Sequence, residues 1–145
     1  MKHVRNLLQK FRRARDGVAA VEFAIIAPVF LMLLFGIVIY GSYLAVVNGV
    51  QQLAAEAARS SVAGLSESER STLANAYVTG NINSYPLIKP AQLTVNAATS
   101  GSDANVFVVT VSYNASGMFI YSLPSFLPAP SSTISRSAAI PRGGY

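Results

Sequence analysis

One carboxylate in this sequence stands where its charge is hard to accommodate, at the start of a long apolar stretch. Glu22 is the last charged residue before residues 23–55, in which no side chain carries a charge. A carboxylate at the centre of a bilayer costs about 2.5–3.5 kcal/mol, and less near the surface. Glu22 therefore either lies among lipid headgroups, close to Arg15, or has a specific charge partner inside the apolar region.

The residue types that most catalytic and metal sites require are missing. The sequence has no Cys and a single His, His3, so disulfides, thiolate metal sites and His- or Cys-based nucleophiles have no residues to form them. Glu67 and Glu69 would point apart on a helix, which disfavours a paired-carboxylate site. A Ser–Lys dyad built on Lys89 stays formally open. We expect no enzyme, no cofactor, no metal site and no small-molecule substrate.

The basic charge of the chain is confined to its beginning. Of the 145 residues, 52% are hydrophobic and 12% are charged, against about 25% charged in an ordinary soluble domain. Residues 1–17 contain six basic side chains and Asp16, which together account for the whole net charge of +5. A nucleic-acid-binding protein needs a basic face on its folded part. We therefore expect no nucleic-acid partner, and the length allows one domain.

The apolar run is long enough to cross a membrane. Residues 23–47 are strongly apolar and would extend roughly 37 Å as a helix, whereas a bilayer core needs about 20 residues. A cleaved secretory signal has a shorter core of about 7–15 residues, and too little chain remains to surround a buried soluble helix. The basic residues before the run place the N-terminus in the cytoplasm by the positive-inside rule. The sequence thus predicts a single-span anchor with its C-terminal part outside the cytoplasm.

The residues around Glu22 resemble a known processing site and a known family. A basic leader, Gly17, and an apolar helix with Glu at the fifth position after that glycine are similar to a prepilin-peptidase site. Residues 17–62, with the core AAVEFAIIAPVFLMLLFGI, Gly41 and the stretch AAEAARSS around Arg59, resemble the TadE-like family. These are pseudopilin-like proteins of the tight-adherence (Flp, type IVc) pilus machinery. TadG-like relatives share this beginning but carry a much larger C-terminal part, so the length favours TadE.

The resemblance implies roles for three residues. It implies that a prepilin peptidase cuts between Gly17 and Val18, and that Glu22 neutralises the new Val18 amine in its own chain or in a neighbour. In a medium of low dielectric such a pair is favoured over two separate charges. The implied partners are the membrane, the peptidase, and other pilins or pseudopilins with their assembly machinery. The implied location is the bacterial inner membrane, with incorporation into a pilus left open.

Past the apolar run the pattern predicts a small α+β domain, which the resemblance implies to be pilin-like. We divide the chain into a basic cytoplasmic leader (1–17), a transmembrane helix (18–48) and an extracytoplasmic domain (49–145). The long helix is expected to continue to Gly64. The residues expected on its inward face are Val50, Leu53, Ala54, Ala57, Ala58 and Val62. Glu56 and Arg59 lie three apart on the other side and are expected to pair weakly.

A short second helix and three strands are expected to complete this domain. Ser66 and Glu69 have the spacing of a capping box, which predicts a helix from Glu67 to about Thr79. The side chains expected to face inward from it are Leu73, Ala76 and Tyr77. Alternation predicts strands over residues 92–97, 105–113 and 133–140, the first two joined by a turn at 100–103 into an antiparallel hairpin. Arg136 falls on the inward face of the third strand.

The proline-rich segment, residues 117–130, is apolar but unsuited to regular structure. Its three prolines disfavour a continuous strand or helix. Its apolar side chains either fold back over the sheet and complete the core, or form an exposed patch that docks another pilin-like subunit or the membrane surface. Phe119, Tyr121 and Phe126 are the predicted partner contacts.

Two other functions remain open at this stage. One is a single-span, membrane-anchored extracytoplasmic binding or adhesion module unrelated to pili. The other is a secreted protein with an atypical signal. Removal of the leader at Gly17 with retention of the apolar helix would distinguish the pseudopilin from both.

Overall fold

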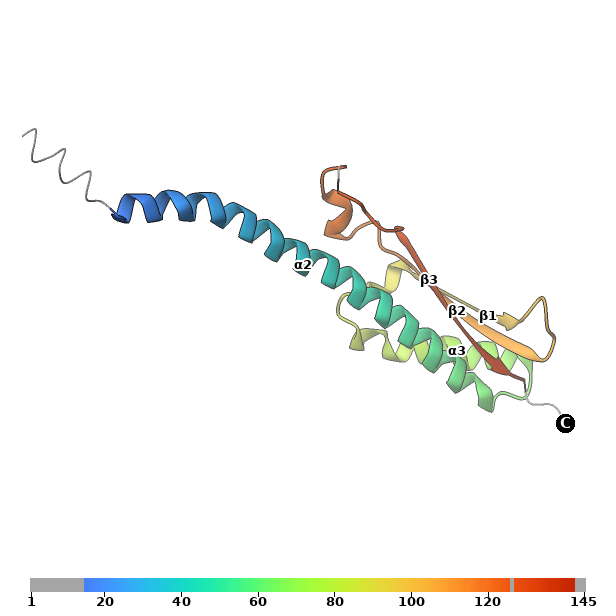
Figure 1. The fold of residues 1–145 in the computed structure, drawn as a ribbon. Helices are drawn as coiled ribbons and strands as arrows, with labels where there is room; N and C mark the ends of the chain where they lie inside the picture. The colour runs from blue at the N-terminus through green and yellow to red at the C-terminus, as the bar shows by residue number, and fades with distance from the viewer. Residues whose placement is uncertain (1–14, 126, 143–145) are drawn as a thin grey trace, which may run out of the picture. The chain divides into compact units, whose positions relative to one another are not determined.

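The computed structural model describes residues 15–125 and 127–142. The predicted basic leader therefore lies almost entirely outside the described residues, as does Phe126. Contacts divide the chain into two units, Met1–Val38 and Ile39–Tyr145. The first unit is described here by its part of helix α2, Arg15–Ser60, which contains Pro28 and continues into the second unit (Figure 1).

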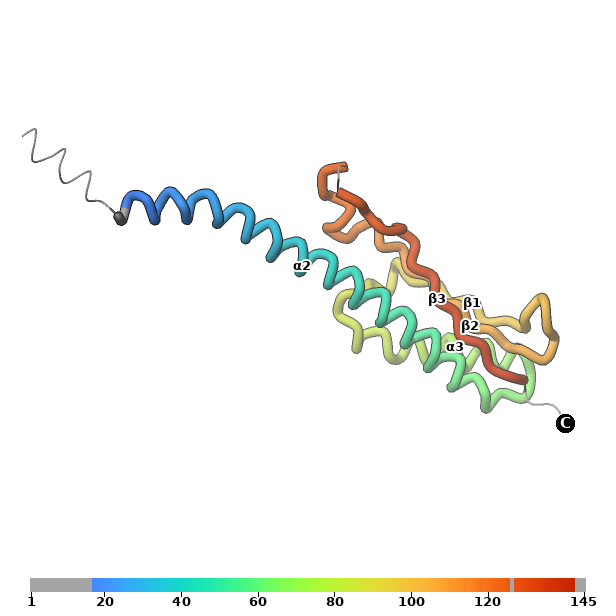
Figure 2. The backbone as a smooth tube through the Cα atoms, viewed as in Figure 1, coloured from blue at the N-terminus to red at the C-terminus, as the bar shows by residue number. Residues whose placement is uncertain are grey.

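The second unit is an α+β arrangement, as the sequence predicts. After α2 come the 3-10 turn η1 (Ser61–Ala63), helix α3 (Glu67–Asn81), the turns η2 (Ile82–Ser84) and η3 (Pro90–Gln92), strands β1 (Leu93–Thr99) and β2 (Val106–Asn114), the turn η4 (Phe119–Ser122) and strand β3 (Thr133–Pro141). The strands form one antiparallel sheet in the order β1-β2-β3. The β1–β2 turn and the β2–β3 connection consequently lie at opposite ends of the sheet, as the backbone tube in Figure 2 shows.

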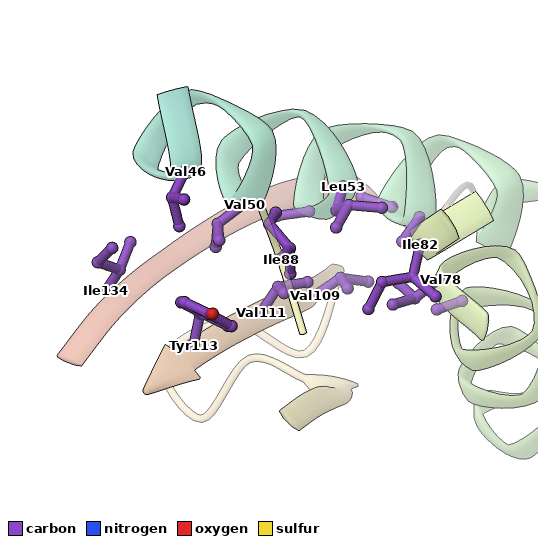
Figure 3. Close-up of a cluster of buried hydrophobic side chains, with 14 of the residues drawn as sticks. Val46, Val50, Leu53, Val78, Ile82, Ile88, Val109, Val111, Tyr113 and Ile134 are labelled. Atoms are coloured by element: carbon purple, nitrogen blue, oxygen red, sulfur yellow. The ribbon is translucent and has the colours of Figure 1, made fainter. Parts of the chain in front are cut away.

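The core lies between one face of this sheet and the two helices. Val46, Val50 and Leu53 of α2 point toward the sheet and meet Val109 and Tyr113 of β2 (Figure 3). Five of the six residues expected inward from the continued helix are buried. Val62 is the exception and is 53% exposed, because the α-helix ends at Ser60 and the following 3-10 turn changes the direction of its side chain.

Helix α3 begins where its capping residues predict, but presents a different face to the core. The Glu69 N–H donates to the Ser66 hydroxyl (3.2 Å), while the Glu69 carboxylate accepts from the Leu65 N–H (2.9 Å) instead of from Ser66. The helix continues through Gly80 to Asn81, two residues beyond the predicted end.

The buried stripe of α3 is one step away from the predicted one. Arg70, Ala74 and Val78 are buried, whereas Ala76 is exposed and both Leu73 and Tyr77 are only half-buried. The buried stripe contains a charged residue, so apolar periodicity favoured its wholly apolar neighbour. The sequence did not predict a buried Arg70. Its guanidinium donates to the carbonyl of Arg142, a contact between residues far apart in the sequence.

The strands agree closely with the predicted ranges. Phe107, Val109 and Val111 are fully buried on the inner face of β2, as alternation predicts. On β3, Arg136 follows Ile134 on this face and is half-buried, with its guanidinium donating to the Ser135 carbonyl (2.8 Å). An inward-pointing charge on an edge strand discourages pairing with another strand.

Candidate functional site

The three residues predicted to take part in processing and charge neutralisation all lie in the first turns of α2. Gly17, Val18 and Glu22 are helical, and each is exposed. Val18 and Glu22 are four residues apart, a spacing that puts two side chains on the same face of a helix. The helix therefore brings the Glu22 carboxylate to the side of the chain on which the Val18 side chain lies.

The apolar side chains that follow them are uncovered by the rest of the protein. All the large apolar residues of 18–38 are exposed, and the most hydrophobic 18-residue window of the helix, with a mean hydropathy of 2.7, has none of its residues buried. In the part of the chain that the structure describes, this is the one helix with the length and composition to cross a membrane. In this it differs from the core helix of a soluble protein, which is mostly buried. An N-terminal helix of this kind suits membrane anchoring.

The comparison with protein families found one similarity. The model of the TadE-like protein family matches residues 17–59. Over this segment the chain is TadE-like. The match begins at Gly17, includes Glu22 and ends at Arg59, so the resemblance predicted from these residues is confirmed. No curated protein and no solved structure matches the chain.

The TadE-like segment comprises nearly all of α2, and it contains both an uncovered and a buried portion. Residues 18–38 have no cover, whereas Val46, Val50 and Leu53 belong to the core of the second unit. At the end of the match Arg59 pairs with Glu56 (3.3 Å), as expected. The family segment thus supplies both the candidate span and the helix on which the α+β unit is built.

The predicted partner contacts in the proline-rich segment are divided between surface and core. Phe119 is 67% exposed, whereas Ile120 beside it is buried. Tyr121 is half-buried, and its hydroxyl donates to the Ser131 carbonyl (2.7 Å). Burial raises the pKa of Tyr121, and neighbouring Tyr43 adds to the shift. The segment therefore has both buried and exposed apolar side chains, and partner contact at Phe119 and Tyr121 stays a prediction, while Phe126 lies outside the described residues.

Two tyrosines of α2 that sequence reasoning did not single out hold the end of this segment. The Tyr40 hydroxyl donates to the Pro128 carbonyl, and the Tyr43 hydroxyl donates to the Ser131 carbonyl (3.2 Å). The only sequence signal was the placement of both tyrosines at the C-terminal end of the apolar run, where aromatic residues with a polar tip are common in membrane helices.

A second unpredicted feature is the environment of Arg70 at the start of α3. Its guanidinium donates through Nη2 to the Arg142 carbonyl (2.7 Å), while Nη1 is buried without a hydrogen-bond partner in the described structure. An open cavity of about 480 Å³ adjoins it, lined also by Leu65 and Asn105. The bond to the Arg142 carbonyl ties α3 to the end of β3.

Proposed function

We propose that this protein is a TadE-like minor pseudopilin, a membrane-anchored structural and assembly component of Tad (Flp, type IVc) pilus biogenesis, and not an enzyme. The observation that carries the proposal is the family match over residues 17–59, which starts at the glycine preceding the predicted cut. The uncovered apolar helix supports the membrane part of the proposal.

The proposed location is the bacterial inner membrane, crossed once. The six basic residues of 1–17 precede the span, and no basic residue follows it until Arg59. By the positive-inside rule this distribution keeps the N-terminus in the cytoplasm and the α+β unit outside it. Other pilins or pseudopilins and the assembly machinery are the proposed partners.

In this proposal a prepilin peptidase removes residues 1–17 and leaves the whole apolar helix in place. Cleavage of the Gly17–Val18 bond creates an amine on Val18, and Glu22 lies one helical turn further along. The amine of one chain is neutralised by the carboxylate of its own or a neighbouring chain. Because separate charges in an apolar medium are costly, this pairing favours subunits that are correctly aligned.

The N-terminal mass of membrane-extracted protein tests the processing step. We expect loss of residues 1–17 in cells that contain the peptidase and an intact leader in cells that lack it. Gly17→Leu should block cleavage, because a bulky side chain then occupies the cleaved bond. Gly36→Leu, in the same helix but remote from the cut, is the control and should be processed normally. Unchanged cleavage of Gly17→Leu at this bond would contradict the site.

Pilus output tests the role of Glu22. Glu22→Ala should leave membrane insertion intact, since it removes a charge from the span, yet reduce pilus formation at least tenfold, whereas Glu22→Asp should be milder. Glu56→Ala, which removes a half-buried helix carboxylate remote from Gly17, is the control. Normal pili from the Glu22→Ala strain would reduce Glu22 to a residue of the headgroup layer. Two results together would instead favour a membrane-anchored binding module: a leader that stays uncleaved in cells that make the protein, and normal pilus output in a strain that lacks it.

A further inference from the structure

The proline-rich segment lies in a part of the chain that has no charged residue at all. Between Asp103 and Arg136 the sequence contains no Asp, Glu, Lys or Arg. The segment nevertheless keeps apolar side chains at its surface, since Phe119 is 67% and Leu127 is 39% exposed. An uncharged surface with exposed aromatic and aliphatic groups is suited to contact with an apolar or interfacial medium.

Two tyrosine hydroxyls of α2 fix the C-terminal end of this segment to the beginning of the second unit. The Tyr40 hydroxyl donates a hydrogen bond to the Pro128 carbonyl. The hydroxyls of Tyr43 and of Tyr121, which is itself in the segment, both donate to the Ser131 carbonyl. Tyr40 and Tyr43 occupy the first turn of α2 within the unit Ile39–Tyr145. The segment is therefore held at the level of the helix that directly follows the uncovered apolar run.

The length of that run agrees with the thickness of a bilayer core. Residues 18–38 would extend roughly 31 Å as a helix, and a hydrocarbon core is about 30 Å thick. From Val46 onward the helix buries side chains in the core of the second unit. Residues 40–43 then fall where the hydrocarbon ends, the level at which tyrosines with one apolar and one polar end are enriched.

We propose that the bilayer core ends near Val38 and that the proline-rich segment, together with Tyr40 and Tyr43, lies in the lipid headgroup layer as a second membrane-contacting element. The occupant of the exposed surface around Phe119 is thus the lipid surface. The inference rests on the proposed membrane anchoring. It adds that the α+β unit is seated on the membrane through its β2–β3 connection, with the side chains of Phe119 and Leu127 directed into lipid.

The distribution of charge within the second unit agrees with this assignment. Charged groups of both signs occupy the end of the sheet opposite to the connection: Glu67 accepts bonds from Thr99, Asp103 accepts one from the Asn105 N–H, and Arg142 donates to the Ala104 carbonyl. Near the connection end, Lys89 donates its backbone N–H to the Tyr113 hydroxyl (3.4 Å). A lysine at this end is compatible with anionic headgroups, whereas a carboxylate would be repelled.

The absence of cysteine from the sequence makes a site-specific probe straightforward. Phe119→Cys in the full chain is labelled with an environment-sensitive fluorophore and reconstituted into vesicles of zwitterionic and anionic phospholipids. Leu65→Cys is the matched control, because Leu65 is an apolar residue with 95% exposure at the α2–α3 junction. We expect blue-shifted emission at position 119 and at least twofold stronger quenching there than at 65 by lipids with a nitroxide near the headgroup.

Two further readings separate the ways in which the inference can fail. Emission at position 119 that matches position 65, with a probe at Ile26→Cys still quenched by deeply placed nitroxides, would overturn the inference and leave the anchor intact. A water-like probe at Ile26→Cys would instead show that the proposed anchoring itself fails. If the signal at position 119 depends on the ratio of protein to lipid, the surface is occupied by a second copy of the chain, which also overturns the inference.

Discussion

The two halves of helix α2 have the same secondary structure but different surroundings. In residues 18–38 the large apolar side chains are exposed all around the helix, and the rest of the protein covers none of them. Further along, Val50 and Leu53 are completely buried, while Gln51 and Gln52 between them are exposed. A helix that is apolar on every side needs an apolar medium, whereas one with a single apolar stripe needs only a packed neighbour.

This difference shows how one helix can belong to two environments. In the proposed membrane anchor, the placement of the first half depends only on its apolar composition, because lipid accommodates apolar side chains of any shape. The second half depends on the shape of each side chain, because it must fit the sheet beneath it. Matched substitutions in the two halves should therefore have different consequences, and the following predictions use this contrast in order of decreasing effect.

Truncating one leucine in each half should give the largest contrast. Leu53→Ala removes a fully buried side chain from the core and should lower the free energy of unfolding by about 2–5 kcal/mol. Leu33→Ala removes an exposed side chain of similar size from the uncovered half and should leave that free energy unchanged. Denaturant unfolding of the full-length protein in detergent micelles measures both. Equal losses would mean that both halves are packed within the fold.

Introducing a charge should affect the uncovered half and not the packed half, which is the opposite of what we expect for the leucine truncations. Phe30→Arg places a guanidinium near the middle of the uncovered half, where it should disfavour membrane insertion by about 2.5–3.5 kcal/mol. Gln52→Arg puts the same group on the exposed side of the packed half and should have no effect on insertion. The fraction of each variant that resists alkaline extraction from membranes is the measurement. Full retention of Phe30→Arg would contradict a lipid environment for residues 18–38.

Two glycines of α2 allow the packing difference to be tested at the backbone. A Cβ at Gly49 would lie 3.0 Å from Ile88 and from the ring of Tyr85, whereas a Cβ at Gly36 would meet nothing within 4 Å. Gly49→Leu should therefore overpack the core and lower the free energy of unfolding by about 1–3 kcal/mol. Gly36→Leu should be neutral. Thermal unfolding of both variants checks this, and a stabilised Gly49→Leu protein would refute the close packing of α2 on residues 85–88.

The smallest expected effect is a pH dependence of the stability of the second unit. Hydrogen bonds from the Thr99 hydroxyl and N–H lower the pKa of Glu67 from its ordinary value of 4.5. This stabilisation is present above that value and is lost as the pH falls through the lowered pKa of the folded state. Thr99→Val should therefore be slightly less stable than the unmodified protein at pH 7, with the difference vanishing in acid.

The control for this pH dependence is Thr94→Val on the same strand. The Thr94 hydroxyl donates to the Ser112 carbonyl and touches no carboxylate, so its substitution should produce a pH-independent change. A Thr99→Val protein whose difference from the unmodified protein persists unchanged after the Glu67 carboxylate has been fully protonated by acid would exclude Glu67 as the group responsible.

The features of the fold that local patterns control could be predicted from the sequence. The alternation around Phe107 and Val109 located β2, and Ser66 with Glu69 located the start of α3, because strand pleating and helix capping involve residues close in sequence. The inward face of α3 could not be predicted in this way. Its buried member Arg70 donates through Nη2 to the carbonyl of Arg142, 72 residues away, and no local pattern predicts such a contact.

The candidate site follows the same division. Gly17, Val18 and Glu22 could be proposed from the sequence because their predicted role depends on spacing within one helix, and the family match includes all three positions. The bonds that Tyr40 and Tyr43 make to carbonyls 88 residues further along could not. Every residue has a backbone carbonyl, so a hydroxyl can donate to any residue type. The sequence of the proline-rich segment therefore does not show which helix turn it contacts.

A cysteine scan of α2 in the membrane-bound protein tests the central contrast most directly. Single cysteines replace Ile25 and Leu33 in the uncovered half and Gln51 and Gln52 in the packed half, and a water-soluble maleimide is added on the side where Gln51→Cys reacts. Our account predicts that both glutamine positions are labelled rapidly and that Ile25→Cys and Leu33→Cys are labelled only after solubilisation and denaturation. Equal labelling at all four positions in the intact membrane would contradict it, because residues 18–38 would then lie in water.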